Sequence, residues 1–171
     1  MDPQASQNRP ATIRPRLLSI LCYLTIFASS YMLVSSLSAL ANIDQTIDLL
    51  SQSLDKASAV FDKSLAADPA TAENLDEALA QIAASITRSN MRDHHVFNLI
   101  SNLLTMIGAS LMLRLRKRGF HLYLLGTLIA FVAPLLVFGS DSLLGFAFSF
   151  STALFGGLFV ILYSLKIKYM H

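Results

Sequence analysis

Four long segments without an Asp, Glu, Lys or Arg constrain this chain more than any other feature of its sequence. They cover residues 17–41, 96–113, 119–138 and 143–165. A helix rises 1.5 Å per residue and needs about 20 apolar residues to cross the hydrocarbon core of a bilayer, which is about 30 Å thick. Of the 171 residues, 54% are hydrophobic and 14% are charged. We therefore predict an all-α integral membrane protein with a bundle of four transmembrane helices.

The basic residues predict how the chain is oriented in the membrane. Nine of the 13 Lys and Arg residues fall in the tail 1–16, the turn 114–118 and the tail 166–171, with a single acid among them. Basic flanks are retained on the cytoplasmic face during insertion. Both termini are therefore expected in the cytoplasm. The alternative is that the first span is a cleaved signal peptide, but the apolar core of a signal peptide is about 7–15 residues long. The first span is longer, so we expect it to be retained.

Residues 42–95, between the first two spans, show the periodicity of two amphipathic helices. Apolar residues recur at steps of three and four on both sides of Asp68-Pro69, which suits the start of a helix. We predict an extracytoplasmic helical hairpin that continues the first two transmembrane helices without a break. Its apolar stripes contain Ile47, Leu50, Leu54, Phe61, Leu75, Leu79, Ile82 and Ile86.

Two interpretations of this hairpin remain open. The stripes can pack against each other as a self-contained antiparallel pair. They can also form an association surface, on which a second copy or another membrane protein completes a helical bundle. The acidic outer face is interpreted as a solvated surface, with cation binding as the alternative.

The second span carries polar residues close to one face of its helix. Because residues three and four apart lie on the same side of a helix, we expect this face to point inward. Such side chains hydrogen-bond neighbouring helices in membranes, or they line a path for a small solute. The four residues are Asn98, Ser101, Asn102 and Thr105.

The fourth span carries small residues every four positions, a pattern that lets two membrane helices approach closely. This groove packs against a helix of the same bundle or forms an interface with a partner. Its members are Gly145, Ser149, Ala153 and Gly157.

Little in the composition suits catalysis or metal binding. The chain has one cysteine, four histidines and no tryptophan. His94 and His95 follow Asp93, but consecutive residues point about 100° apart on a helix, unlike the i, i+4 pair that binds zinc. We expect membrane-interface anchoring there. No phosphate loop, nucleophile elbow or nucleic-acid fold is found. We therefore expect no enzyme activity, no cofactor and no nucleic-acid partner.

The basic turn and the start of the third span resemble a pattern in small bacterial four-helix membrane proteins of uncharacterised function. The resemblance covers about residues 96–168 and implies a location in the bacterial cytoplasmic membrane. It rests on Arg116, Lys117, Arg118, Gly119, Phe120, His121, Leu122 and Tyr123.

These features predict a function in binding rather than in catalysis. The first hypothesis is a membrane scaffold or accessory subunit that contacts a partner, or further copies of itself, through the hairpin and the small-residue groove. The alternative is a small homo-oligomeric channel or transporter for a neutral solute, because the apolar cores lack the ionisable groups that ion-coupled transporters use.

Overall fold

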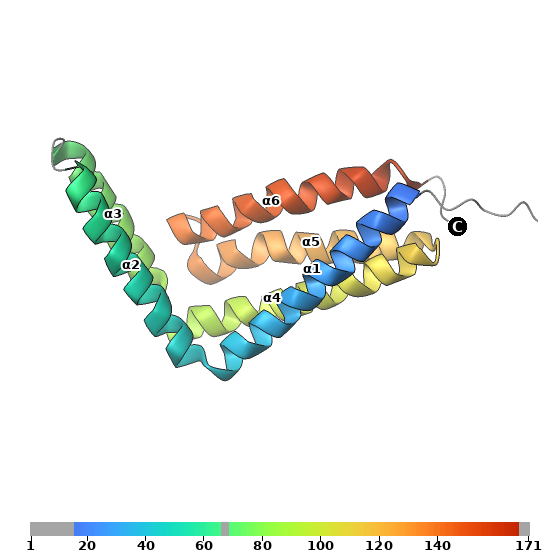
Figure 1. The fold of residues 1–171 in the computed structure, drawn as a ribbon, viewed down its shortest axis with the longest axis horizontal. Helices are drawn as coiled ribbons and strands as arrows, with labels where there is room; N and C mark the ends of the chain where they lie inside the picture. Colours follow the sequence, from blue (N-terminus) through green and yellow to red (C-terminus); the bar gives the residue numbers. More distant parts are fainter. Residues whose placement is uncertain (1–15, 66–68, 168–171) are drawn as a thin grey trace, which may run out of the picture.

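The computed structural model describes the backbone of residues 16–65 and 69–167, and their side chains apart from 62–65 and 69–73. Within these residues the fold consists of six α-helices and contains no strand (Figure 1). The helices are α1 (Arg16–Ala41), α2 (Ile43–Leu65), α3 (Pro69–Ser85), α4 (Arg88–Leu113), α5 (Lys117–Phe138) and α6 (Leu143–Ser164). The predicted all-α class is confirmed. Four of the helices, α1, α4, α5 and α6, are long and apolar enough to span a membrane, which supports a multi-pass membrane protein.

The closest helix packing is between α4 and α5, because glycines bring their backbones together. A Cβ added to Gly108 would lie 2.7 Å from the backbone nitrogen of Tyr123, and one added to Gly126 would lie 2.9 Å from the carbonyl oxygen of Ser101. Ser101 also donates a hydrogen bond of 2.8 Å to the carbonyl of Gly126. Small residues that allow such approach are the usual basis of helix packing in membranes.

The other two spans pack on opposite sides of this central pair. Helix α1 packs against α4, and α6 packs against α5. Figure 1 shows α1 and α6 close together near the chain termini and separating toward the opposite end of the bundle. A buried core lies at the end where they are close, and its members are Leu18, Leu21, Cys22, Ala109, Met112, Tyr123 and Tyr163.

Helices α2 and α3 form a hairpin, but they do not continue α1 and α4 as straight extensions. Helix α1 ends at Ala41, and α2 starts at Ile43 in a different direction (Figure 1). Helix α3 ends at Ser85, and the side chain of Thr87 accepts a hydrogen bond from the backbone nitrogen of Asn90 at the start of α4. The expectation of two unbroken helices is therefore wrong at both junctions.

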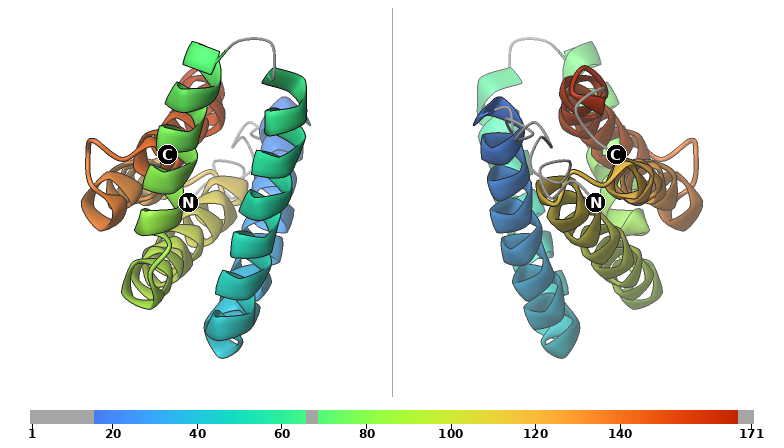
Figure 2. Two further views of the ribbon diagram at one scale, coloured as in Figure 1. Left: turned by 90° about the vertical axis from the view of Figure 1, so that its left-hand side faces the viewer. Right: turned by 90° about the vertical axis from the view of Figure 1, so that its right-hand side faces the viewer.

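The hairpin lies across one end of the bundle. Figure 2 shows α2 on the side of α1 and α3 on the side of α6. Hydrogen bonds hold α3 to the turn between α5 and α6: the Gln81 side chain donates to the carbonyl of Asp141 at 3.1 Å, and the hydroxyls of Ser85 and Ser142 lie 3.1 Å apart. These contacts, made far along the chain, explain why the hairpin turns toward α6.

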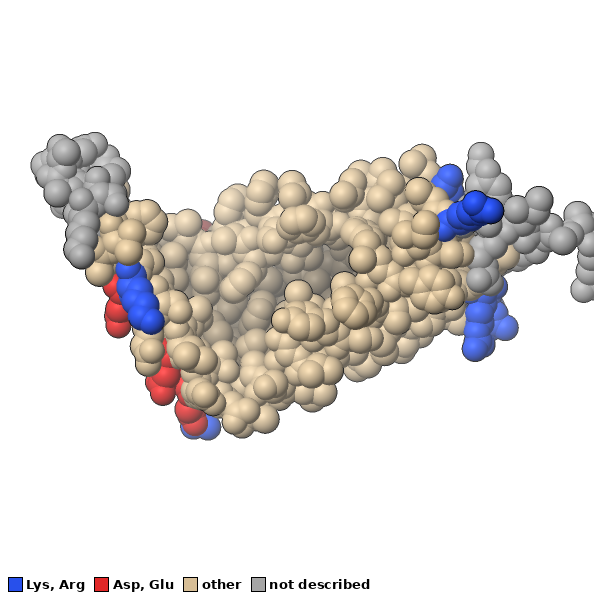
Figure 3. Space-filling view, viewed as in Figure 1, with Lys and Arg blue, Asp and Glu red and all other residues tan. Residues whose placement is uncertain are grey.

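Charged residues lie at the two ends of the molecule. Figure 3 shows acidic and basic side chains on the outer face of the hairpin, and basic side chains at the opposite end of the bundle. On the hairpin side, Arg88 and Asp44 approach to 3.3 Å, and both are largely exposed. Such exposed pairs contribute little to stability. The surface between the two ends is uncharged on the face in view.

Candidate functional site

A cleft with a volume of about 460 Å³ lies within the bundle, where α1 and α6 separate. Residues from α1, α4, α5 and α6 line it, and the surface is hollowed in this region in Figure 3. A volume of this size is within the range of small-molecule sites in proteins, about 300–1,000 Å³. The cleft is therefore the candidate functional site.

All four polar residues singled out on the second span, which is α4, line the cleft: Asn98, Ser101, Asn102 and Thr105. Ser101 and Thr105 are buried and bonded to other groups. Thr105 donates to the carbonyl of Asn102 at 3.1 Å and is hydrogen-bonded to the Ser29 hydroxyl on α1 at 3.0 Å. The polar face thus joins helices, as one interpretation of the sequence expects, and also lines the cleft, as the other expects.

Asn98 and Asn102 form a pair of amides within the cleft wall. The side-chain nitrogen of Asn102 donates to the side-chain oxygen of Asn98, and also to its backbone carbonyl at 2.8 Å. In the part of the chain that the structure describes, this arrangement leaves the Asn98 amide nitrogen and the Asn102 amide oxygen without a hydrogen-bond partner. The pair therefore offers one donor group and one acceptor to a molecule in the cleft.

The other cleft walls are apolar. No Asp, Glu, Lys or Arg is found among the described residues that line the cleft. The large apolar side chains come mainly from the two outer helices and are Leu24, Met32, Phe97, Phe148, Phe155 and Phe159. Apart from His94, a charged ligand would find no ion partner among these residues, and burial of an unpaired charge is costly. The cleft chemistry therefore suits a neutral molecule.

The cleft is closed toward the end of the bundle near the termini. There the hydroxyls of Thr25 and Tyr163 are hydrogen-bonded at 2.8 Å. The ring of Tyr163 also contacts the ring of Tyr123 edge-on, with centroids 4.9 Å apart. Tyr163 is fully buried and belongs to the core described above. No local sequence pattern indicates the contact between Thr25 and Tyr163, because 138 residues separate them.

His94 and His95 lie at the hairpin end of the bundle and face different cavities. His94 lines the cleft, and its ring stacks on Phe148 with centroids 5.0 Å apart. His95 lines a second pocket of about 610 Å³ at the bend between α1 and α2, together with Asn42 and Gln45. Within the described residues, no three His, Cys, Asp or Glu side chains are placed to hold a metal ion.

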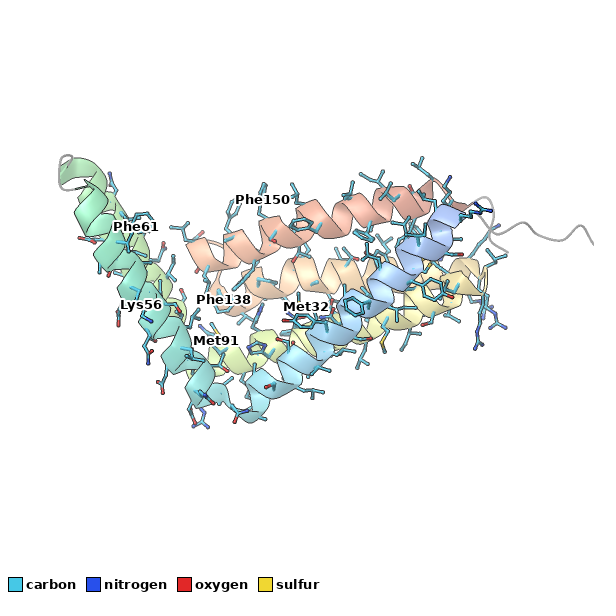
Figure 4. All side chains as sticks on the ribbon, in the orientation of Figure 1. Met32, Lys56, Phe61, Met91, Phe138 and Phe150 are labelled. Atoms are coloured by element: carbon cyan, nitrogen blue, oxygen red, sulfur yellow. The ribbon has the colours of Figure 1, made fainter. Side chains whose placement is uncertain are left out.

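The apolar stripe of the hairpin is mostly half-buried. Phe61, labelled in Figure 4 near the far end of α2, is 43% exposed. The half-buried members on the two arms and the adjoining junction are Ile47, Leu50, Leu54, Leu75, Leu79, Ile82 and Ile86. Because these side chains are already partly covered within the chain, the stripe offers a partner less apolar surface than the sequence pattern alone suggests.

The small residues of α6 do not all face the same neighbour. Gly145 and Ser149 are buried against α5, and Ser149 donates a hydrogen bond of 2.8 Å to the carbonyl of Phe131. Ala153 is exposed, and a Cβ on Gly157 would meet no atom within 4 Å. In this part of α6 it is Gly156 that packs against α5, because a Cβ at this position would lie 2.7 Å from a Thr127 methyl carbon.

A helical turn has 3.6 residues, so residues spaced exactly four apart rotate gradually around the helix axis. Such a series turns away from the neighbouring helix after a few steps. This rotation explains why the sequence pattern pointed to Gly157 and missed Gly156. A mixed count of three and four residues would have found it.

Comparisons of the chain with protein-family models, with curated proteins and with solved structures find no match. The resemblance of residues 116–123 to small bacterial membrane proteins therefore stays a prediction. The functional argument rests on the geometry and chemistry of the cleft.

Proposed function

We propose that this chain is a non-enzymatic, multi-pass membrane protein that binds a neutral molecule in the cleft between α1 and α6. One observation carries the proposal: a cleft of about 460 Å³ has amides and hydroxyls among mostly apolar lining residues, with no Asp, Glu, Lys or Arg among those described. This develops the hypothesis of a transporter for a neutral solute. The closed end at Tyr163 favours a carrier or binding protein over an open channel.

The proposal includes the orientation that the charges predict. The basic turn between α4 and α5 and both chain ends would lie in the cytoplasm, and the hairpin would lie on the opposite side. The membrane would be the bacterial cytoplasmic membrane, as the resemblance of residues 116–123 implies. In this orientation the cleft widens toward the outer face of the membrane.

A cleft-blocking variant tests the proposal. Ser151 and Ala153 are both exposed on α6, but only Ser151 lines the cleft. Ser151→Phe should fill the site, and Ala153→Phe should leave it open. The purified protein is melted in detergent with a panel of neutral polar solutes and neutral lipids.

At least one compound should raise the melting temperature of the wild type and of Ala153→Phe but not of Ser151→Phe. The proposal would be wrong if no compound stabilises the wild type, or if the blocked variant responds like the wild type. Ligand stabilisation grows with the logarithm of ligand concentration, so each compound is tested over a hundredfold range.

A second candidate function, an accessory subunit, is favoured by the open side of α6. Helix α6 is the least buried of the four spans. Its residue Ala153 is exposed, and a Cβ on Gly157 would meet no atom within 4 Å, so a helix of another protein or of a second copy could approach closely. Mild detergent extraction after cross-linking tests this. A partner at fixed stoichiometry that is lost in Gly157→Leu supports the accessory role. Recovery of the monomer alone contradicts it.

A further inference from the structure

We infer that the ligand of the cleft is a monoacylglycerol-like lipid, with a neutral head that bears hydroxyls and an ester carbonyl and with a hydrocarbon chain. The inference rests on the proposed function and names the ligand class for the same site. Three observations carry it: the unpaired groups of the Asn98–Asn102 pair, the aromatic walls and the direction in which the cleft opens.

The amide pair selects the head group. Asn98 retains an amide nitrogen that can donate, and Asn102 retains an amide oxygen that can accept. A head that presents only acceptors would leave the Asn102 oxygen unpaired, and a head that presents only donors would leave the Asn98 nitrogen unpaired. A hydroxyl beside a carbonyl satisfies both groups. A bound ligand that covers these two groups without hydrogen-bonding them leaves them unsatisfied, which is costly, so this match discriminates between ligands.

The aromatic walls select the rest of the molecule. Phe148, Phe155 and Phe159 line the cleft from α6, opposite Leu24 and Met32 of α1 (Figure 4 labels Met32). These side chains would contact a hydrocarbon chain along its length. A small water-soluble solute would also fill only part of the 460 Å³ and would leave many of the apolar lining side chains without an apolar contact.

The cleft opens between two helices whose outer surfaces suit lipid. Leu24 is half exposed on α1, and Phe155 is 62% exposed on α6, and both line the cleft. In a chain that spans the membrane, such side chains at the edge of a cleft place its entrance beside lipid tails. A lipid can therefore enter from the side, with its head carried inward to the amides, without passing through water.

Charged lipids do not fit the site. A fatty acid or a phospholipid carries an anionic head, and the described lining contains no Lys or Arg to pair with it, which leaves His94 as its one basic side chain. A pure hydrocarbon fits the aromatic walls but leaves the amide pair unsatisfied. These two classes, together with free glycerol, serve as comparison ligands in the test.

The absence of tryptophan from the chain provides a sensitive assay. A single tryptophan placed at Phe155 reports from the cleft. One placed at Phe150, which is 58% exposed and on the side of α6 away from α1, serves as the control (Figure 4). A monoacylglycerol with a dibrominated chain is titrated into each full-length variant in detergent. Quenching should saturate in Phe155→Trp and rise without saturation in Phe150→Trp.

Competition then defines the ligand class. Unlabelled monooleoylglycerol should reverse the quenching at concentrations at least tenfold lower than oleate, octadecane or glycerol. Adding Asn98→Ala or Asn102→Ala to the Phe155→Trp protein should weaken binding about threefold to tenfold, as expected for lost hydrogen bonds inside a membrane protein. The melting temperatures of these variants without ligand show that their fold is intact.

Each other result counts against the inference in a defined way. If octadecane or oleate competes as well as monooleoylglycerol, or if both asparagine variants bind unchanged, the acylglycerol class is wrong while a ligand cleft remains. If quenching does not saturate in Phe155→Trp, the lipid inference is overturned, and the melting test with Ser151→Phe decides separately whether the cleft binds any neutral molecule.

Discussion

Tyr163 near the end of α6 and Thr25 in α1 are joined by a hydrogen bond of 2.8 Å between their hydroxyls, although 138 residues of sequence separate them. This bond lies where the two outer helices are closest and marks the closed end of the cleft. The core around it contains residues from α1, α4, α5 and α6. The fold thus holds its first and last helices together at one end of the bundle and lets them separate at the other.

Removal of this hydrogen bond should weaken the fold. In Tyr163→Phe the Thr25 hydroxyl loses its partner while the ring packing remains. Hydrogen bonds between membrane helices contribute about 0.6 kcal/mol on average and up to about 1.7 kcal/mol. We expect a loss of about 1 kcal/mol, measured by unfolding in mixed detergent micelles. Tyr31→Phe, at a site that is 67% exposed, is the control and should unfold like the wild type. Equal stability of both variants would show that the bond is energetically neutral.

The adjacent glycines of α6 should respond differently to the same substitution. A Cβ at Gly156 would lie 2.7 Å from Thr127, whereas a Cβ at Gly157 would meet nothing within 4 Å. Gly156→Ala should therefore push α6 away from α5 and destabilise the protein by about 1–3 kcal/mol. Gly157→Ala should be neutral or slightly stabilising, because alanine favours a helix over glycine. The same unfolding assay measures both variants, and the opposite order of stabilities would contradict the packing described here.

A carboxylate inside the hairpin should loosen it without affecting the four spans. Leu54 is half-buried on the stripe of α2, so Leu54→Asp places a charge where an apolar side chain packs. We expect faster cleavage of the hairpin by a protease added outside proteoliposomes, with normal membrane insertion. Leu49→Asp, at a position that is 57% exposed, is the matched control and should be cleaved at the wild-type rate. Ile82→Asp on α3 should behave like Leu54→Asp.

The proposed orientation can be tested with single cysteines, because the natural Cys22 is buried and should react slowly. Ser140→Cys places a thiol in the exposed turn between α5 and α6, and Arg116→Cys places one at the basic turn between α4 and α5. A membrane-impermeant maleimide added to intact cells should label Ser140→Cys within minutes and label Arg116→Cys only after the cells are broken. Labelling in the reverse order would place the termini outside.

Solute movement provides a functional test of the polar cleft wall. If the protein carries its ligand across the bilayer, Asn102→Ala should slow the exchange of that ligand between the leaflets of proteoliposomes by at least severalfold. Ala153→Ser changes an exposed residue outside the cleft and should exchange at the wild-type rate. Equal rates in wild-type and empty liposomes would restrict the protein to binding without transport.

The four spans could be predicted from the sequence because a charged side chain in a bilayer is costly. Each span is therefore visible as a continuous segment without Asp, Glu, Lys or Arg. The bend at Asn42 could not be predicted, since it contains no strong helix breaker. Helical hydrogen bonds continue through the bend: the backbone nitrogen of Asn42 donates to the carbonyl of Ser38 at 3.1 Å, and the backbone nitrogen of Thr46 donates to the carbonyl of Asn42 at 3.0 Å. The direction of the hairpin depends instead on contacts of Gln81 and Ser85 with the turn between α5 and α6, which lies about 60 residues away in sequence.

Half of the candidate site was predictable in the same way. Helical spacing places the four polar residues of α4 on one face, and a polar face in a membrane must be covered. The opposite wall could not be predicted, because phenylalanines of α6 are equally suited to lipid. Phe155 lines a cleft because α1 and α6 separate beyond the contact between Thr25 and Tyr163, and this arrangement joins residues far apart in the sequence.

The hairpin is attached to both helices that border the cleft, since α2 follows directly from α1 and α3 is hydrogen-bonded to the turn that starts α6. A force on the hairpin from outside the membrane would therefore act on both sides of the opening at once. The hairpin is thus mechanically connected to α1 and to α6. Load on it would be converted into a change in the width of the cleft.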